Sequence, residues 1–365
     1  MSEPYEAVWD IDELDYPAGG TNDEILRFIL RYAVLAPSGH NGQPWSFHLE
    51  DGVLHVRADR TRALPTVDPD DRELLIACAA TVHLATLALE HFGHYPGVRL
   101  LPDDTDPDLL AVIAPGARGP MPASRELFDA IVHRRSNRAP YLDVPPSDEE
   151  LARLRGAAAA HGAWLHPITE PDRIAAAADL IADGDRIRWR EPVFRAELAR
   201  RLIPNRGERR DGIPGYAFGV PGVLAPLAPL LVRHVDLGRA CAASDRKLTQ
   251  ATPALAVIGT DTDEPIAWLH AGLALSHVLL RATADQLATS FMSQAIEVPE
   301  LRPRLAELLG HSGYPQLLLR VGYPTRDARP APRRDVATVL AGTSVRTVAT
   351  SRARSAVRAV SGSRG

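Results

Sequence analysis

Two basic segments have the composition of an anion site. Residues 134–138 read Arg-Arg-Ser-Asn-Arg, and Arg333 and Arg334 form a second basic pair near the end of the patterned sequence. A guanidinium group can form paired, charge-assisted hydrogen bonds with a phosphate, and the hydroxyl of Ser136 adds another donor. A solvated basic surface would explain either segment alone. Both together favour a site for a phosphate monoester.

A third segment, residues 36–45, reads Ala-Pro-Ser-Gly-His-Asn-Gly-Gln-Pro-Trp. It ends an apolar-periodic run with a turn that is rich in hydroxyl and amide groups, and these can both donate and accept hydrogen bonds. We expect Trp45 to pack behind this loop as an anchor. Taken alone, the segment is explained equally well as an ordinary polar loop.

Sites of several other kinds are not indicated. The sequence contains no GxGxxG after a strand, no GxxxxGK[ST], no GxSxG and no HExxH. Cys78 and Cys241 are far apart and lack a Cys-x-x-Cys spacing, so neither a disulfide framework nor a thiolate metal cage is expected. His91 and His94 are three residues apart and could begin a metal site, but no third ligand is indicated nearby. We expect them instead to meet the helix dipole and solvent, and we predict no metal site.

The elements that would position these segments occur twice. A capped helix from Asn22, a hairpin joined by Asp51-Gly52, a long apolar helix and a short strand come first. A similar order follows after Ser124, with helices at 124–132 and from Ser147, a strand at 252–260, a second long apolar helix and a strand at 316–324. His83 and His277 fall at matching points of the two apolar helices, where we expect core or interface histidines. Two such halves resemble a fused homodimer.

The second half must contain an insertion. His83 and His277 are 194 residues apart, whereas the helices that begin at Asn22 and Ser147 are only 125 apart, which leaves 69 residues unaccounted for. The insertion includes residues 212–232, an uncharged stretch long enough to cross a membrane. Its four prolines argue against a spanning helix, because each removes a backbone hydrogen bond. We expect an apolar flap or a buried irregular segment.

The composition is that of an ordinary globular protein. Of 365 residues, 45% are hydrophobic and 24% charged, with a formal net charge of −5, which gives no reason to expect nucleic acid as a partner. No secretory signal is recognised at the start, so we expect a cytoplasmic location without a membrane partner. We divide the chain into a leader (1–20), a first half (21–120), a second half (121–340) with a flap at about 203–233, and a disordered basic tail (341–365).

Taken in order, the segments APSGHNGQPW, RRSNR, WLHAGLALSHVLLRATADQLATSFMSQAIEVPELR, LLLRVGYP and PAPRR resemble those of the nitroreductase-like flavoproteins, and among them the single-chain, duplicated Acg-type proteins. The resemblance covers about residues 24–340. It implies an α+β fold with a mixed, mainly antiparallel sheet flanked by helices, duplicated here as a fused pseudo-dimer that could dimerise again. It also implies bound FMN, with NADPH or NADH as a transient donor.

The resemblance further implies roles for particular residues. Arg134, Ser136, Arg138 and Arg333 or Arg334 would hold the FMN phosphate, while the loop of the other half would line the flavin ring and residues 290–294 would approach its pyrimidine or N5 edge. The full set of cofactor-binding residues expected is Pro37, Ser38, Gly39, Asn41, Gln43, Arg134, Ser136, Arg138, Ser290, Phe291, Met292, Gln294, Arg333 and Arg334. No catalytic side chain is expected, because the chemistry takes place at flavin N5.

Three functions remain open at this stage. The first is an oxidoreductase that moves hydride from NAD(P)H through FMN to a nitroaromatic, quinone or similar small acceptor. The second is a protein that holds FMN under a closed flap around residues 211–216, with little or no turnover. The third is a structural or interaction protein with a vestigial flavin site. Since each motif occurs only once in the duplicated chain, we expect one FMN site per chain.

Overall fold

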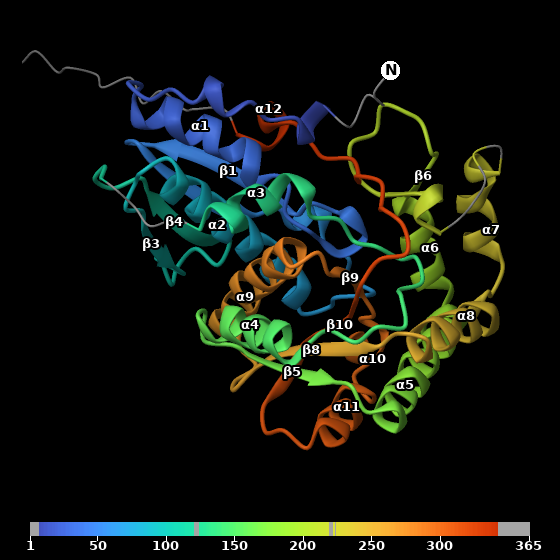
Figure 1. The fold of residues 1–365 in the computed structure, drawn as a ribbon. Coiled ribbons are helices and arrows are strands. Elements are labelled where there is room, and N and C mark those ends of the chain that lie inside the picture. The colour runs from blue at the N-terminus through green and yellow to red at the C-terminus, as the bar shows by residue number, and fades with distance from the viewer. Residues whose placement is uncertain (1–6, 120–123, 219–221, 223, 342–365) are drawn as a thin grey trace, which may run out of the picture.

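Two four-stranded antiparallel sheets form the framework of the molecule, with long helices packed between them (Figure 1). The computed structural model describes residues 7–119, 124–218, 222 and 224–341. The predicted tail beyond residue 341 and the first six residues of the leader lie outside the described residues. The mixture of helices with antiparallel sheets confirms the predicted α+β class.

The first half begins with α1 (Asn22–Ala33), which opens with a capping box formed by Thr21 and Glu24. The strands β1 (Trp45–Glu50) and β2 (Val53–Ala58) form the predicted hairpin. Asp51 and Gly52 both have positive φ, at 51° and 73°, as a two-residue hairpin turn requires. The half is completed by α2 (Arg72–His91), β3 (Gly97–Leu100) and β4 (Leu109–Ala114), and its strand order is β1-β2-β4-β3.

The second half follows the same plan. The helix α4 (Asp148–Ala159) opens with a capping box of Ser147 and Glu150, matching that of α1. The sheet contains β5 (Trp164–Ile168), β8 (Ala254–Thr260), β9 (Ala288–Phe291) and β10 (Tyr314–Gly322), and α9 (Pro265–Ala284) lies between β8 and β9 in sequence. Its order, β5-β8-β10-β9, repeats that of the first sheet strand for strand. This repetition is what an internally duplicated fold requires.

The insertion lies between β5 and β8, at the position where the first half has only the Asp51-Gly52 turn. It consists of α5 (Pro171–Arg190), α6 (Pro192–Arg201), β6 (Leu202–Ile203), β7 (Ile213–Pro214), α7 (Ala228–His234) and α8 (Gly238–Gln250). Figure 1 shows these helices grouped on one side of both sheets. The strand β5 was not among the predicted elements, and it contains a proline, Pro167. A proline is tolerated there because β5 is an edge strand.

The two halves meet along α2 and α9. A Cβ atom on Gly272 of α9 would lie only 2.3 Å from the backbone oxygen of Ile76 in α2, so the absence of a side chain allows the two helices to approach closely. The helix α3 (Arg125–His133) also contacts both. The imidazole rings of His83 and His277 stack at this interface with centroids 5.2 Å apart, which confirms that they are interface histidines.

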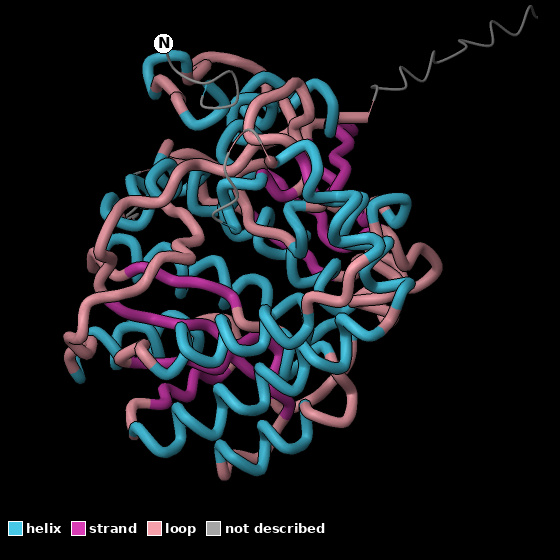
Figure 2. Tube along the Cα trace, turned by 90° about the vertical axis from the view of Figure 1, so that its right-hand side faces the viewer, coloured by secondary structure: helices cyan, strands magenta, loops and turns pink. Residues whose placement is uncertain are grey.

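The C-terminal segment links the second half back to the first. After α10 (Gln294–Glu297), α11 (Arg302–Leu309) and β10, the chain runs without regular structure to α12 (Val336–Val339), which lies beside α1 and β1 (Figure 1). The backbone N–H of Ala341 donates to the carbonyl of Phe47 at 2.9 Å. Figure 2 shows from the side how loops and helices cover the strands of both sheets. The segment carries Arg333 and Arg334 to the first half.

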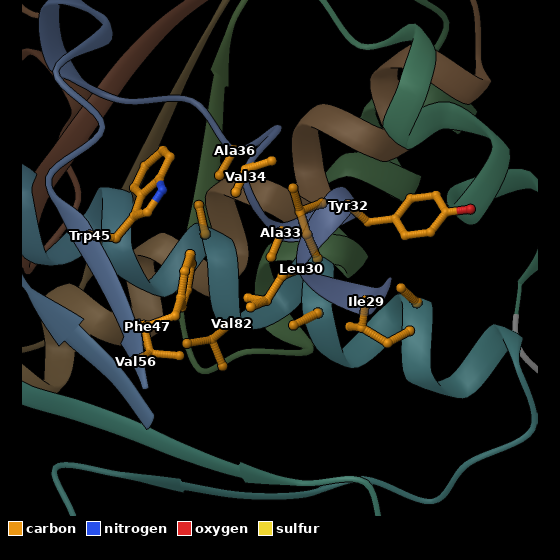
Figure 3. Close-up of a cluster of buried hydrophobic side chains, with 14 of the residues drawn as sticks. Ile29, Leu30, Tyr32, Ala33, Val34, Ala36, Trp45, Phe47, Val56 and Val82 are labelled. Carbon is orange, nitrogen blue, oxygen red and sulfur yellow. The ribbon is translucent and has the colours of Figure 1, made fainter. Parts of the chain in front are cut away.

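A buried cluster of apolar side chains fixes the start of the first half. Trp45 and Phe47 of β1 are fully buried and belong to the same apolar cluster as Leu30 and Ala33 of α1 (Figure 3). This confirms the expectation that Trp45 anchors the chain behind the polar loop.

Two segments, residues 212–232 and α2, are apolar and long enough to cross a membrane. Within the described part of residues 212–232 the structure has short helical turns and α7. Ile213 and Ala225 are buried, whereas Leu227 and Leu230 are 60% and 62% exposed, so the expectation of a buried segment is only partly correct. The prolines do not prevent α7, because Pro229 occupies its first turn, where a missing N–H costs nothing. A different helix, Arg72–His91, is long and apolar enough to cross a membrane, but 83% of its apolar window is buried within the fold.

Candidate functional site

The polar loop at residues 38–43 has an unusual backbone. His40, Asn41 and Gln43 have φ values of 48°, 52° and 52°, a left-handed conformation that costs non-glycine residues about 1–2 kcal/mol each. The loop is held by its own side chains, because the backbone N–H of Gln43 donates to Ser38 Oγ at 2.9 Å. Pro37 is buried at its entrance. Strain of this kind persists where surrounding contacts enforce it, and it is found most often at functional sites.

The C-terminal basic pair supplies those contacts. Arg333 donates from Nη1 to Asn41 Oδ1 at 2.9 Å, and the backbone N–H of Arg334 donates to Gln43 Oε1 at 2.8 Å. Arg334 Nη1 also reaches the carbonyl of Gln43 at 3.3 Å. Four of the predicted site residues, from opposite ends of the chain, therefore lie together.

Arg134 joins the same cluster from the second half. Arg134 and Arg333 each donate a hydrogen bond to the carbonyl of Leu35 at 3.2 Å, and the two residues are 4% and 3% exposed. Burial, and then the charge of Arg135, lowers the pKa of Arg134 to about 9. Burial, and then the charges of Arg134 and Arg135, also lowers the pKa of Arg333.

In the described part of the chain, neither of these two buried cations is paired with an opposite charge. No carboxylate forms an ion pair with Arg134 or Arg333 among the described residues, and Nε of Arg333 has no hydrogen-bond partner there. A buried charge without an opposite charge is strongly unfavourable. The arrangement fits a bound anion with several acceptor oxygens, such as a phosphate.

Ser136 and Arg138 lie a few residues further along. Ser136 forms a bridge with Thr289 beside β9, and the N–H of Asn137 donates to the carbonyl of Thr289 at 2.8 Å. The Arg138 guanidinium lies 5.9 Å from the centroid of the Phe218 ring in the insertion. The structure thus places Ser136 beside β9 and Arg138 near the flap, whereas Arg134 of the same segment donates to Leu35.

The segment 290–294 follows β9. Ser290 pairs with Arg320 in the sheet, Phe291 is half-buried and Met292 is buried. Gln294 donates from Nε2 to Asp245 at 2.8 Å and to Asp185 at 3.3 Å, while its Oε1 has no partner in the described part of the chain. Burial, and then repulsion from Asp245, raises the pKa of Asp185. Gln294 therefore borders a carboxyl pair supplied by the insertion.

Two residues of this region, Arg320 and Trp9, were not predicted. Arg320 is fully buried within the apolar strand β10, stacks on Tyr141 at 4.3 Å, and has no described partner at Nε or Nη1. Trp9 covers Arg135 at 3.8 Å and Arg333 at 5.0 Å. An arginine inside an otherwise apolar strand was a readable signal for Arg320, whereas Trp9 lies in a leader without periodicity.

The flap closes over the loop. The N–H of Gly212 donates to the carbonyl of Asn41 at 3.1 Å, and Asn41 and Gln43 donate from their amides to the carbonyls of Gly212 and Arg210 at 3.0 and 2.8 Å. Asp211 anchors this contact through ion pairs with Arg62, Arg201 and Arg209. A cavity below the loop, walled partly by Gly39 and Gly42, measures about 20 Å³, which is room for about one water molecule.

His91 and His94 have partners in the leader. His91 Nε2 lies 2.9 Å from Glu13 Oε2, and its ring stacks on Phe128 with centroids 3.5 Å apart. His94 Nε2 lies 2.7 Å from the hydroxyl of Tyr16, and His94 is only 2% exposed. The expectation that these histidines meet solvent is wrong, because the leader packs over the end of α2.

Several curated proteins similar to this chain are named as nitroreductases. No protein-family model matches the chain. "Putative NAD(P)H nitroreductase Rv3131" of Mycobacterium tuberculosis is 32% identical over 87% of this chain and 91% of its own length. "Putative NAD(P)H nitroreductase acg" of the same organism is 28% identical over 85% of this chain and 92% of its own length.

Solved structures are more distant. An FMN- and NADPH-dependent nitroreductase, NfnB from a Sphigopyxis strain, is 19% identical with a TM-score of 0.40, and the match covers 60% of this chain and 98% of that one. A likeness this low supports no conclusion about function. The family is shown instead by Rv3131, which is 32% identical to this chain over nearly the whole length of both proteins. The resemblance inferred from the sequence is confirmed, and the chain belongs to the nitroreductase-like family that includes these mycobacterial proteins.

Proposed function

We propose that this protein is an FMN-dependent oxidoreductase of the nitroreductase type, which takes electrons from NADPH or NADH and reduces a small acceptor such as a nitroaromatic or a quinone. The observation that carries the proposal is the buried pair Arg134 and Arg333, two cations without a carboxylate partner among the described ion pairs. Membership of a family with relatives named NAD(P)H nitroreductases supports the same conclusion.

The residues divide into two groups in this proposal. Arg134 and Arg333 would bind the phosphate of FMN, because their guanidinium groups are buried and Nε of Arg333 is without a described partner. Ser38, Asn41 and residues 290–294 would orient the ring and exclude water from it. Bound FMN supplies the two-electron chemistry, and no side-chain nucleophile or metal is needed for it.

The two arginines allow a direct test of the phosphate assignment. The variants Arg134→Met and Arg333→Met keep most of the buried volume and remove one charged group each. A hydrogen bond to a charged group contributes about 1.5–3 kcal/mol, so each variant should bind FMN roughly 10- to 150-fold more weakly. Arg304→Met, which changes an exposed arginine of α11, is the matched control. FMN content after purification and titration of the FMN-free protein are the measurements; unchanged affinity in both variants would refute the assignment.

A second function is favoured by the closed flap. Asn41 and Gln43 already use their amides on flap carbonyls, and the cavity beneath their loop holds only about 20 Å³. In this arrangement the flap already engages both amides, and it would have to move before a nicotinamide could approach this side of the loop. The alternative is therefore a protein that holds FMN under the flap with little or no turnover.

Anaerobic addition of NADPH and then NADH to the FMN-loaded protein distinguishes the two functions. Bleaching of the flavin within seconds supports the oxidoreductase, and a flavin that stays oxidised supports the closed site. Asp211→Asn should loosen the flap, since it weakens three ion pairs that anchor it. Faster bleaching in this variant would support gating, whereas an equal rate would argue against it. A protein that binds no FMN at all would leave only the structural role.

A further inference from the structure

Three histidines converge where the two halves meet, outside the residues assigned to the proposed function. His83 comes from α2, His161 from the turn after α4, and His277 from α9. One ring nitrogen of each lies within 4.8 Å of the others. The first half therefore contributes one imidazole and the second half two.

The closest pair already has the spacing of metal ligands. His161 Nε2 and His277 Nδ1 are 3.1 Å apart. Two nitrogens bound to one tetrahedral Zn²⁺ at 2.0–2.1 Å are about 3.3 Å apart. A separation of up to 4.8 Å for the third nitrogen requires a movement of about 1.5 Å, which rotation of a side chain can supply.

The third imidazole is what a simple hydrogen-bonded pair does not explain. His161 and His277 can satisfy each other, since one ring N–H donates to the lone pair of the other. His83 is not needed for that pair, yet its ring lies 5.0 and 5.2 Å from the two others. It is held there by Ser276, whose Oγ lies 2.9 Å from His83 Nδ1. A hydrogen-bond partner of this kind typically orients a ligating imidazole.

The histidines are also in the protonation state that a metal requires. Burial lowers the pKa of His161 to about 4, and it lowers the pKa of His83 and of His277 as well. The charge of Arg281, on the same helix, also lowers the pKa of His277. The three imidazoles are therefore neutral at pH 7, with lone pairs available for coordination.

We propose that His83, His161 and His277 bind one divalent transition-metal ion, with Zn²⁺ as the best match. Three imidazoles suit zinc, cobalt, nickel and copper, and exclude the oxygen-preferring calcium and magnesium. His161 and His277 are only half-buried, so a fourth position remains open to water. The ion would connect α2 of the first half to α4 and α9 of the second. This proposal stands independently of the flavin.

Binding of Zn²⁺ and Co²⁺ to the full-length protein tests the proposal. After treatment with a chelator, calorimetric titration with Zn²⁺ should give one ion per chain, and Co²⁺ should give the visible absorption bands of a tetrahedral site. Zn²⁺ should also raise the temperature of thermal unfolding, because it binds only the folded arrangement. X-ray absorption of the zinc-loaded protein should show imidazole nitrogens as the protein ligands.

Variants locate the ion. His161→Gln changes a residue in a turn, where the fold should tolerate it. It should weaken Zn²⁺ binding by at least roughly 100-fold, because loss of a ligand should cost no less than loss of a residue that orients one. Ser276→Ala should weaken it roughly 10-fold, as expected for a residue that orients a ligand. His270→Gln, also on α9 but outside the cluster, should leave it unchanged. Absence of stoichiometric binding by the wild-type protein, or equal affinity in His161→Gln, would overturn the proposal.

Discussion

The close approach of α2 and α9 makes a strong prediction about Gly272. A Cβ atom at this position would lie 2.3 Å from the oxygen of Ile76 and 2.6 Å from Cβ of Ala79. Since ordinary contacts begin near 3.4 Å, Gly272→Ala should force the helices apart by roughly 1 Å. Overpacking of this kind costs about 1–3 kcal/mol, and we expect the upper end because a backbone carbonyl cannot turn aside. The better helix propensity of alanine returns about 1 kcal/mol, which leaves a net loss of about 2 kcal/mol.

A glycine-to-alanine substitution at an exposed helix position should instead raise the free energy of unfolding. Gly156 lies on the exposed side of α4, and a Cβ atom there would meet nothing within 4 Å. Gly156→Ala should therefore stabilise the protein by about 1 kcal/mol. Urea unfolding followed by circular dichroism measures both variants against the wild type. If Gly272→Ala is as stable as the wild type while Gly156→Ala gains stability, the two helices are not as close as this structure has them.

Two further predictions concern pH and the leader. Metal-free protein should lose stability as the pH falls from 7 to 5, because burial lowers the pKa of His161 from 6.5 to about 4, so that the unfolded chain takes up the proton first. The urea midpoint at the two pH values measures this, and a smaller loss in His161→Gln is expected; His277, its hydrogen-bonding partner, contributes in the same direction. Trp9→Leu removes a ring that lies 5.0 Å from the guanidinium of Arg333, and a cation–π contact contributes about 0.5–2 kcal/mol. FMN titration by fluorescence should therefore show weaker binding. Unchanged affinity would show that Trp9 does not contribute to FMN binding.

Helices and strands were predictable from the sequence where residues next to each other in the chain determine the local structure. The capping residues before α1 and α4 and the Asp51-Gly52 turn act within a few residues of their own position, so the sequence displays them directly. The strand β5, which contains Pro167, was not among the predicted elements. What allows this proline is the edge position of β5, which depends on pairing with the distant β8 and cannot be read locally.

The candidate site was likewise predictable only in part. Asn41, Gln43, Arg134 and Arg333 were predicted as members of one site, and the structure brings them together. The hydrogen bonds from the amides of Asn41 and Gln43 to flap carbonyls were not predictable, because they depend on how the insertion folds back over the first half. The burial of Arg320 likewise depends on its neighbours in a sheet rather than on neighbours in sequence.

The duplicated topology bears on the number of flavin sites. In the first half, the connection from α1 to β1 spans residues 34–44 and contains the strained polar loop; in the second, the connection from α4 to β5 spans only residues 160–163. A connection that short has no room for an equivalent of the Ser38–Gln43 loop. Arg134 and Arg333 also approach the first connection, through Leu35. The expected stoichiometry is therefore one FMN per chain, and two equivalent flavins in a monomeric preparation would contradict this account of how the halves diverged.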